Sequence, residues 1–246
     1  MILITGGTGY VGGELLHQAG RTARGVSTRD FDVREPPPLD GYAAVIHTAY
    51  RQKGPEFREI NVEGSRAVAR AAAAAGARLI HVSTDVVFSG RKGGYTENDA
   101  PDPVTEYGES KAAAEEAVRA EHPRALIVRT SLVYGGPGHE PGQHELSARD
   151  PQAAWFTDER RNPVQVADLA AALLELTALE ITGVLHVAGA DAVSRCEFAR
   201  LVAGPDVRCT TSVEAGLLRP LDCTLDSSRA AALLRTRLRG CREVLA

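Results

Sequence analysis

Short apolar runs recur along the first half of the chain, and most of them lead into a segment of strong helix-forming residues. The first run, Ile2 to Ile4, is followed by a helical stretch through Leu16. The longest helical stretch extends from about Glu56 to Gly76, where the glycine is expected to end it. Short continuous apolar runs are typical of strands buried on both faces of a parallel sheet. The runs expected to form the other strands are residues 23–28, 43–47, 78–85 and 124–130.

This alternation of strand and helix predicts an α/β fold, a Rossmann-type doubly wound parallel sheet with a small C-terminal substrate lobe. We expect residues 1–131 and 163–190 to form the dinucleotide-binding Rossmann domain. Residues 132–162 and 191–246 are expected to form the small substrate-binding lobe. Within this lobe, glycines and prolines between Gly136 and Arg149 predict a broken loop in place of a clear helix.

Composition narrows the possible functions. The chain has 246 residues, of which 43% are hydrophobic and 24% charged, as in ordinary soluble globular proteins. A net charge of -4 gives no electrostatic reason to bind nucleic acid or an anionic membrane. No apolar run approaches the ~20 residues of a membrane span, and no signal peptide is recognisable, so a cytoplasmic location is expected. Metal-ligand spacing is absent among the cysteines, which predicts free thiols in preference to disulfides at Cys196, Cys209, Cys223 and Cys241.

A glycine-rich turn follows the first apolar run. Gly6, Gly9 and Gly12 form a G-x-x-G-x-x-G pattern between an expected strand and an expected helix. In a dinucleotide fingerprint the first glycine permits the tight turn, and the second lets the backbone approach a pyrophosphate. The third lets the helix pack on the strand, with the helix N-terminus facing the phosphates. The spacing alone is a weak signal in a chain with 24 glycines, but the strand before it and the helix after it favour cofactor binding.

The end of the second expected strand should meet the adenosine ribose. An acid at this place binds the 2′-hydroxyl of NAD, whereas an arginine accommodates the 2′-phosphate of NADP. The chain offers Thr28 and Arg29, with Asp30 immediately after them. Arg29 therefore favours NADPH, while Asp30 keeps NADH possible.

Tyr107 and Lys111 form the strongest catalytic candidate. Residues at i and i+4 lie on one helical face, and residues 112–118 are strong helix formers. The pKa of a free tyrosine is about 10, so acid–base work near neutrality requires about 4 kcal/mol of stabilisation of the ionised form. One ammonium at about 4 Å in an effective dielectric of about 20 supplies roughly that much. A Tyr–Lys pair at this spacing also arises by chance, so its weight depends on the rest of the chain.

Ser83, Thr84 and Asp85 come at the polar end of the fourth expected strand. Ligands of open parallel sheets lie outside the carboxyl ends of the strands, which places these three side chains well for chemistry. The alternative is that Ser83 and Asp85 only cap a turn.

These segments together resemble one known family. The glycine turn, Ser83-Thr84-Asp85, Tyr107-x-x-x-Lys111 and Arg129-Thr130-Ser131 occur in the order found in extended short-chain dehydrogenases/reductases. The chain is most similar to the dTDP-4-dehydrorhamnose reductase branch of that group. The resemblance implies that Tyr107 donates a proton, Lys111 holds the nicotinamide ribose, and Thr84 hydrogen-bonds the carbonyl oxygen of the substrate.

The same resemblance implies the remaining site residues. Besides the three glycines, Tyr107 and Lys111, the cofactor-binding residues would be Thr8, Tyr10, Val11, Thr28, Arg29, Asp32, Val33, His47, Thr48, Ala49, Asn61 and Ser83. The substrate-binding residues would be Tyr50, Asp85, Val86, Leu132 and Arg161. Val86 and Leu132 depart from the family, which commonly has aromatic residues at both places, so the departures fall on the sugar side.

The function that follows is reduction of a keto group on a nucleotide-activated sugar by NADPH, with NADH possible, in a monomer or homodimer. One alternative is a sugar-nucleotide epimerase or dehydratase. In the dehydratases a glutamate follows the Ser-Thr-Asp triplet, where this chain has Val86. The other alternative is a non-catalytic nucleotide- or nucleotide-sugar-binding or regulatory subunit.

Two further segments are expected to be solvated and without chemistry. His139-Glu140 and His144-Glu145 lack the His-Glu-x-x-His spacing, and Pro141-Gly142 interrupts any helix between them, so no metal site is expected. The basic stretch from Arg235 to Arg239 is interpreted as a solvated edge.

Overall fold

The computed structural model describes residues 1–246, and its chain divides into two compact units. Unit 1 contains residues 1–83, 106–129 and 170–185. Unit 2 contains residues 84–105, 130–169 and 186–246. The predicted assignment of one lobe to the cofactor and the other to the substrate stays a prediction.

Unit 1 is built on a six-stranded sheet in the order β10-β5-β4-β3-β1-β2. β1 pairs in parallel with both β2 and β3, with Ile2 opposite Ala23 and Ala44. The chain order reverses at β1, so the crevice between the carboxyl ends of β1 and β3 is the place where such sheets bind ligands. The strands are β1 (Ile2–Thr5), β2 (Ala23–Val26), β3 (Ala44–His47), β4 (Arg78–Thr84), β5 (Leu126–Thr130) and β10 (Gly183–His186).

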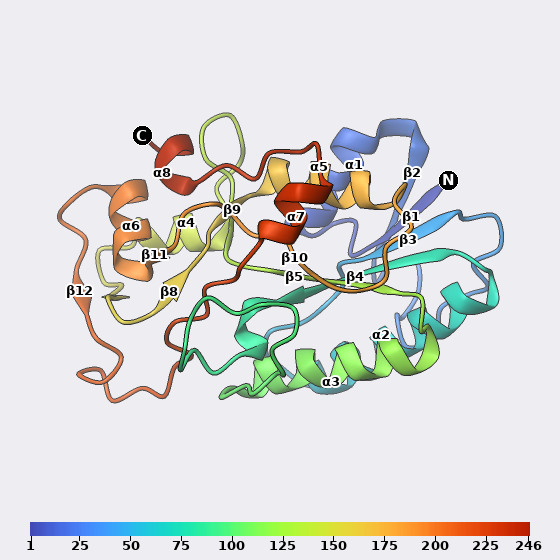
Figure 1. The fold of residues 1–246 in the computed structure, drawn as a ribbon, viewed down its shortest axis with the longest axis horizontal. Helices are drawn as coiled ribbons and strands as arrows, with labels where there is room; N and C mark the ends of the chain where they lie inside the picture. The colour runs from blue at the N-terminus through green and yellow to red at the C-terminus, as the bar shows by residue number, and fades with distance from the viewer. The chain divides into compact units, whose positions relative to one another are not determined.

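Helices cover both faces of this sheet, as the α/β prediction requires. In Figure 1, α2 and α3 run along one face, and α1 and α5 lie on the other. Buried residues of the sheet, including Leu3, Val45 and Leu79, pack against Val68 and Ala72 of α2. The helices are α1 (Tyr10–Ala19), α2 (Phe57–Ala74), α3 (Glu106–Glu121) and α5 (Val166–Leu176).

Predicted strand positions are confirmed, with small differences at their ends. The second strand ends at Val26 instead of Thr28, because Ser27 starts a turn. The Ser27 carbonyl accepts hydrogen bonds from the backbone N–H groups of Asp30 and Phe31. The long helix ends at Ala74, shortly before Gly76, whose φ of 63° is the left-handed conformation that glycine adopts at helix ends.

Unit 2 consists of short paired strands and short helices. β6 (Val133–Tyr134) pairs with β9 (Val164–Gln165), β7 (Trp155–Phe156) with β12 (Cys209–Thr210), and β8 (Arg160–Arg161) with β11 (Val193–Ser194). Its helices are α4 (Gln143–Ala148), α6 (Arg195–Ala203), α7 (Ser228–Leu233) and α8 (Cys241–Val244). Two 3-10 turns, Gly20–Thr22 in unit 1 and Asp85–Val87 in unit 2, complete the elements.

The prediction of a broken loop from Gly136 to Arg149 is wrong for its second half, where α4 forms. The start of α4 is stabilised by the Glu145 side chain, which is 3% exposed. The Glu145 carboxylate accepts hydrogen bonds from the backbone N–H groups of Gly135 (2.7 Å), Gly136 (3.0 Å) and Gly142 (2.7 Å). The glycines that suggested a loop thus donate to the side chain that fixes the helix start.

No helix of the chain is long and apolar enough to cross a membrane.

Candidate active site

The glycine turn between β1 and α1 has the geometry of a phosphate cradle. Gly6 has a φ of 72°, and its carbonyl accepts the N–H of Gly9 at 2.8 Å. A Cβ on Gly12 would overlap the Gly6 carbonyl, whereas one on Gly13 would meet nothing within 4 Å. α1 begins after Gly9 without a side-chain cap. Its first N–H groups therefore face a turn that requires glycine at positions 6 and 12, as at a dinucleotide pyrophosphate site. Thr8 and Tyr10 are exposed beside this turn, and Val11 is half-buried.

The two candidate selectivity residues after β2 have different surroundings. The Asp30 carboxylate accepts hydrogen bonds from the backbone N–H (2.8 Å) and hydroxyl (3.1 Å) of Ser27, and these bonds lower its pKa. Asp30 is thus bound within its own turn. Arg29 and Thr28 are exposed, and the Arg29 guanidinium has no ion-pair partner. This arrangement suits a 2′-phosphate better than a 2′-hydroxyl.

Asp32 and Val33 lie further along the same turn. The Asp32 carboxylate holds the Arg34 guanidinium, with an Nη2–Oδ2 distance of 2.6 Å, and this bond lowers the pKa of Asp32. Val33 is half-buried, and its side chain packs so closely on Gly64 of α2 that a Cβ at Gly64 would collide with it.

The carboxyl ends of β1 and β3 are joined by buried side chains. His47 is 1% exposed, and its Nδ1 lies 2.6 Å from the Thr5 hydroxyl and its Nε2 lies 3.1 Å from the Ser65 hydroxyl. Burial lowers the pKa of His47 to about 3, with a further contribution from Lys111. Thr48 donates to the Thr5 carbonyl at 2.7 Å. A Cβ on Gly6 would strike Thr48 and Ala49, so the predicted dinucleotide-lining residues are adjacent in unit 1.

Asn61 of α2 holds the segment that carries Tyr50. Its amide accepts from the Arg51 N–H and donates to the Arg51 carbonyl, both at 2.8 Å, and donates to the Ser110 hydroxyl at 3.0 Å. It is 1% exposed. Asn61 therefore ties the loop after β3 to α3, and its predicted support of the dinucleotide stays a prediction.

Tyr107 and Lys111 lie on α3, and unit 1 places Tyr50 beside both. The rings of Tyr50 and Tyr107 have centroids 5.9 Å apart, and the Lys111 Nζ lies 5.8 Å from the Tyr50 centroid. Lys111 is 3% exposed and donates to the Val82 carbonyl at 2.8 Å. Burial lowers the pKa of Lys111 to about 8, although the Glu115 carboxylate raises it in part. A buried ammonium on the helical face of a tyrosine is the arrangement that the proposed acid–base chemistry requires.

Sequence reasoning missed the role of Glu115, one helical turn after Lys111. Its carboxylate is 0% exposed and accepts from Arg129 Nε (3.0 Å), Arg129 Nη2 (2.8 Å) and the Ser83 hydroxyl (2.6 Å). Arg119 adds a fourth bond at 2.9 Å. The i+4 spacing from Lys111 is the signal that could have revealed it. Ser83, predicted as a cofactor residue, therefore binds this carboxylate.

Unit 2 holds the predicted catalytic residue Thr84 and the predicted substrate-binding residues Asp85 and Arg161. The Thr84 hydroxyl donates to the Asp85 carboxylate at 3.2 Å and accepts the Val86 N–H at 3.3 Å. Asp85 is 3% exposed, accepts from the Ser131 hydroxyl at 2.5 Å, and lies 3.6 Å from Arg161 Nε. Burial raises the pKa of Asp85, opposed by Arg161. Leu132 is 6% exposed and follows Ser131 directly.

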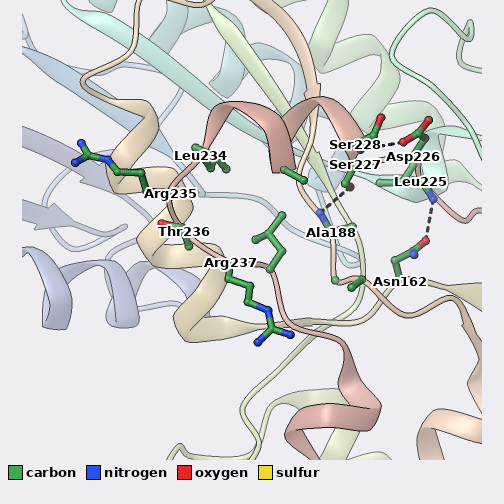
Figure 2. Close-up of a pocket in the computed structure, with 14 residues that line it drawn as sticks. Asn162, Ala188, Leu225, Asp226, Ser227, Ser228, Leu234, Arg235, Thr236 and Arg237 are labelled. Carbon is green, nitrogen blue, oxygen red and sulfur yellow. Dashed lines mark hydrogen bonds between the residues drawn. The ribbon is translucent and has the colours of Figure 1, made fainter.

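A surface cavity of about 530 Å³ lies elsewhere in unit 2. It is bounded by α7 and by the chain around Ala188 and Leu238, and Figure 2 shows Asn162 and Ser227 bonded to backbone at its edge. None of the predicted catalytic, cofactor or substrate residues lines it. No group of three or more His, Cys, Asp or Glu side chains could hold a metal ion.

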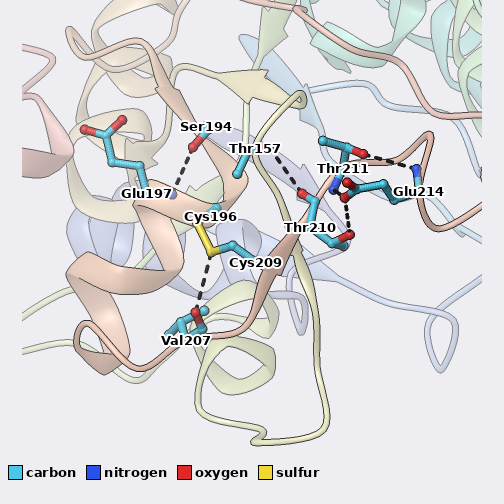
Figure 3. The surroundings of a disulfide bond; sticks show 9 residues. All are labelled: Thr157, Ser194, Cys196, Glu197, Val207, Cys209, Thr210, Thr211 and Glu214. Carbon is cyan, nitrogen blue, oxygen red and sulfur yellow. Dashed lines mark hydrogen bonds between the residues drawn. A yellow bond between two sulfur atoms is a disulfide. The ribbon is translucent and has the colours of Figure 1, made fainter.

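The prediction of four free thiols is wrong for one pair. Cys196, near the start of α6, forms a disulfide with Cys209 of β12, and their Cα atoms are 5.7 Å apart (Figure 3). The pairing of β12 with β7 brings Cys209 to Trp155, which packs in one apolar cluster with Cys196. Proximity in space, which their 13-residue separation does not reveal, makes the bond possible. Cys223 and Cys241 are free, as predicted, and both are buried.

Comparison with known proteins agrees with this geometry. The family described as the RmlD substrate binding domain matches residues 1–246. The dTDP-4-dehydrorhamnose reductase of Mycobacterium tuberculosis is 38% identical over 224 residues, covering 82% of this chain and 74% of the relative. The dTDP-4-dehydrorhamnose reductase of Mycolicibacterium smegmatis is 35% identical over 272 aligned residues, which cover 99% of this chain and 83% of the relative. The crystal structure of the Bacillus anthracis dTDP-4-dehydrorhamnose reductase in complex with NADP superimposes with a TM-score of 0.85. It is 25% identical and covers 99% of this chain and 96% of that one.

The sheet order, glycine turn and Tyr–Lys helix define the class as an extended short-chain dehydrogenase/reductase. Within this class, the chain belongs to the RmlD substrate binding domain family.

Proposed function

We propose that this protein is an NADPH-dependent reductase of a keto group on a nucleotide-activated sugar. The observation that carries the proposal is the buried Lys111 ammonium beside Tyr50 and Tyr107, in the same unit as an uncapped helix N-terminus behind a glycine turn. A protein that only binds a nucleotide does not need a proton donor such as Tyr107. It therefore does not need a buried lysine on the same helical face as that tyrosine. The names of the relatives support the reaction class and the substrate class.

The residues present fit the dinucleotide. A side chain at Gly6 or Gly12 would strike the protein itself, so these glycines permit the tight turn that brings backbone N–H groups toward a pyrophosphate. Arg29 offers an unpaired guanidinium to a 2′-phosphate. When bound, NADPH would supply the hydride for the carbonyl carbon of the substrate.

The chain's own residues supply the proton and orient the oxygen. The Tyr107 hydroxyl donates its proton to the carbonyl oxygen, which becomes the new hydroxyl group. The Lys111 ammonium stabilises the negative charge left on the phenol oxygen, and the resemblance to the family assigns it the nicotinamide ribose as well. The Thr84 hydroxyl, whose single proton bonds Asp85 in this structure, would turn that proton to an oxygen of the substrate.

Val86 argues against the dehydratase alternative. A dehydratase uses a carboxylate at this position to remove a sugar proton, and an isopropyl group cannot act as a base. Net reduction therefore consumes one NADPH for each sugar reduced, without loss of water. The regulatory-subunit alternative predicts nucleotide binding without turnover.

The test is a panel of 4-keto nucleotide sugars, including dTDP-4-dehydrorhamnose, incubated with the purified protein and NADPH. The proposal predicts loss of NADPH absorbance together with a product two mass units heavier than the substrate. Loss of water from a nucleotide sugar that still has its 4-hydroxyl, incubated with NAD⁺ that is unchanged at the end, would establish the dehydratase alternative instead. Binding of NADPH without oxidation by any sugar in the panel would establish the regulatory alternative.

A further inference from the structure

Unit 2 contains a cluster of buried and partly buried charges in which the cations outnumber the anions. Three guanidinium groups, from Arg161, Arg195 and Arg219, surround the carboxylates of Asp85 and Glu159. Asp85 is 3% and Glu159 is 0% exposed. One positive charge is therefore left without a matching negative charge.

Two of the three arginines are occupied by groups of the protein. Arg161 lies 3.6 Å from both carboxylates and donates to the carbonyls of Leu221 (2.6 Å) and Pro220 (2.8 Å). Arg219 Nε donates to Glu159 at 2.6 Å. The guanidinium N–H groups of Arg161 and Arg219 thus hold the segment 219–221 against β8, the strand that contains Arg161.

Arg195 is the unmatched cation. It has no carboxylate within ion-pair distance, and its buried Nε has no hydrogen-bond partner. Its Nη2 lies 3.3 Å from His144 Nδ1, and its Cζ lies 4.8 Å from the centre of the Trp155 ring. Buried donors without partners are rare in folded proteins because leaving them unpaired costs free energy. The residue as a whole is half-buried, and burial lowers the pKa of its guanidinium to about 10, although Glu159 raises it in part.

His144 is suited to act with Arg195. A guanidinium can only donate, so His144 Nδ1 accepts and its Nε2 carries the proton. Burial and the nearby Arg195 and Arg161 lower the pKa of His144 to about 3, so the ring is neutral near pH 7. His144 thus holds Arg195 in place without neutralising its charge.

We infer that Arg195, positioned by His144 and Trp155, binds an oxyanion group of the substrate, either a phosphate or a sugar carboxylate. The inference rests on the proposed function in taking the ligand to be the substrate. An oxyanion beside the Arg195 guanidinium would balance the excess positive charge of the cluster.

Trp155 makes the inference directly measurable, because it is the only tryptophan of the chain and it is 5% exposed. Its fluorescence is followed while sodium pyrophosphate or sodium glucuronate is added at constant ionic strength. We expect a saturable change with at least one of the two anions, and the anion that acts identifies the group as phosphate or carboxylate. Potassium chloride at the same ionic strength should produce no saturable change.

The variants assign the response to Arg195. Arg195→Gln should weaken the apparent affinity about 10- to 100-fold, the range expected for losing a charge-assisted hydrogen bond. Arg195→Lys, which keeps the charge without the planar fork, should retain weak binding even if the glutamine variant does not fold. Arg200→Gln, an exposed position on the same helix, is the matched control and should bind as the parent does.

No saturable change with either anion would overturn the inference, and so would a response that Arg195→Gln leaves intact. This titration requires no NADPH and no turnover. A protein that binds the anion through Arg195 but reduces no sugar would refute the proposed function while leaving the anion site standing.

Discussion

Replacing Glu115 by glutamine should both destabilise the protein and change the pH dependence of its activity. The Glu115 carboxylate is 0% exposed and pairs with Arg129, which is 1% exposed, through two bonds of 3.0 and 2.8 Å. Glutamine keeps the size of the side chain but leaves the buried guanidinium without a counter-charge. Removing one partner of a buried ion pair costs about 3–5 kcal/mol. The Arg119 bond adds little to this figure, because Arg119 is 41% exposed.

The effect on activity acts through Lys111. Glu115 raises the pKa of Lys111, which burial has already lowered to about 8. Without the carboxylate this pKa falls further, so the ammonium is lost at a lower pH and turnover declines earlier on the alkaline side. At an effective dielectric of about 20, removing one charge several ångströms away is worth on the order of 1–2 kcal/mol, or about one pH unit.

Urea unfolding measures the first effect, and the pH profile of kcat for NADPH oxidation measures the second. Glu116→Gln is the matched control, because Glu116 is the exposed neighbour on α3 and its replacement should cost less than about 0.5 kcal/mol. A loss below about 1 kcal/mol for Glu115→Gln would refute the ion-pair reasoning. An alkaline limb that stays in place would refute the coupling of Glu115 to Lys111.

The remaining predictions concern the cofactor, the lysine and the disulfide. Gly12→Ala should weaken NADPH binding at least about 10-fold in a fluorescence titration, because its Cβ would overlap the Gly6 carbonyl. Gly13→Ala should have little effect on NADPH binding. Equal NADPH affinities of the two variants would contradict the assignment of the glycine turn as the pyrophosphate site. Arg29→Ala should reduce NADPH affinity while leaving NADH affinity unchanged, and a parent protein with equal affinity for both would make Asp30 the selectivity residue. Folded Lys111 loses its proton at about pH 8, below its ordinary value of 10.5, so the unfolded chain binds more protons between these values. Stability should therefore rise by up to roughly 3 kcal/mol over that interval, a rise that Lys111→Met should lack in urea unfolding. Reduction of the Cys196–Cys209 bond should lower stability by about 3 kcal/mol, and an unchanged melting temperature after reduction would show that the bond contributes little.

Local patterns predicted the fold because the strands and helices of unit 1 depend on residues close in sequence. The apolar run of Ile2 to Ile4, the glycine turn and the helix after it are one continuous segment, and the structure forms them as predicted. The end of β2 was placed two residues too late, because the Asp30 turn that ends it competes with strand formation. Tyr107 and Lys111 are also close in sequence, so their i, i+4 spacing was sufficient to place them on one face of α3.

Contacts between distant residues could not be predicted in the same way. The helix α4 depends on Glu145 reaching Gly135 ten residues earlier, and the Arg195–His144 contact spans 51 residues. The disulfide depends on the pairing of β7 with β12, which brings Cys209 opposite Trp155. Short strands such as these have no periodic pattern long enough to reveal their partners.

The most direct test of the central claim is NADPH oxidation by the parent protein and by Tyr107→Phe on the 4-keto nucleotide sugar that the parent reduces best. We expect the variant to bind NADPH with nearly unchanged affinity, because the phenol hydroxyl acts on the substrate oxygen. Turnover should fall by about 10²–10⁴-fold, the range for loss of a general acid. Equal rates of NADPH oxidation by parent and variant on that sugar would contradict the assignment of Tyr107 as the proton donor.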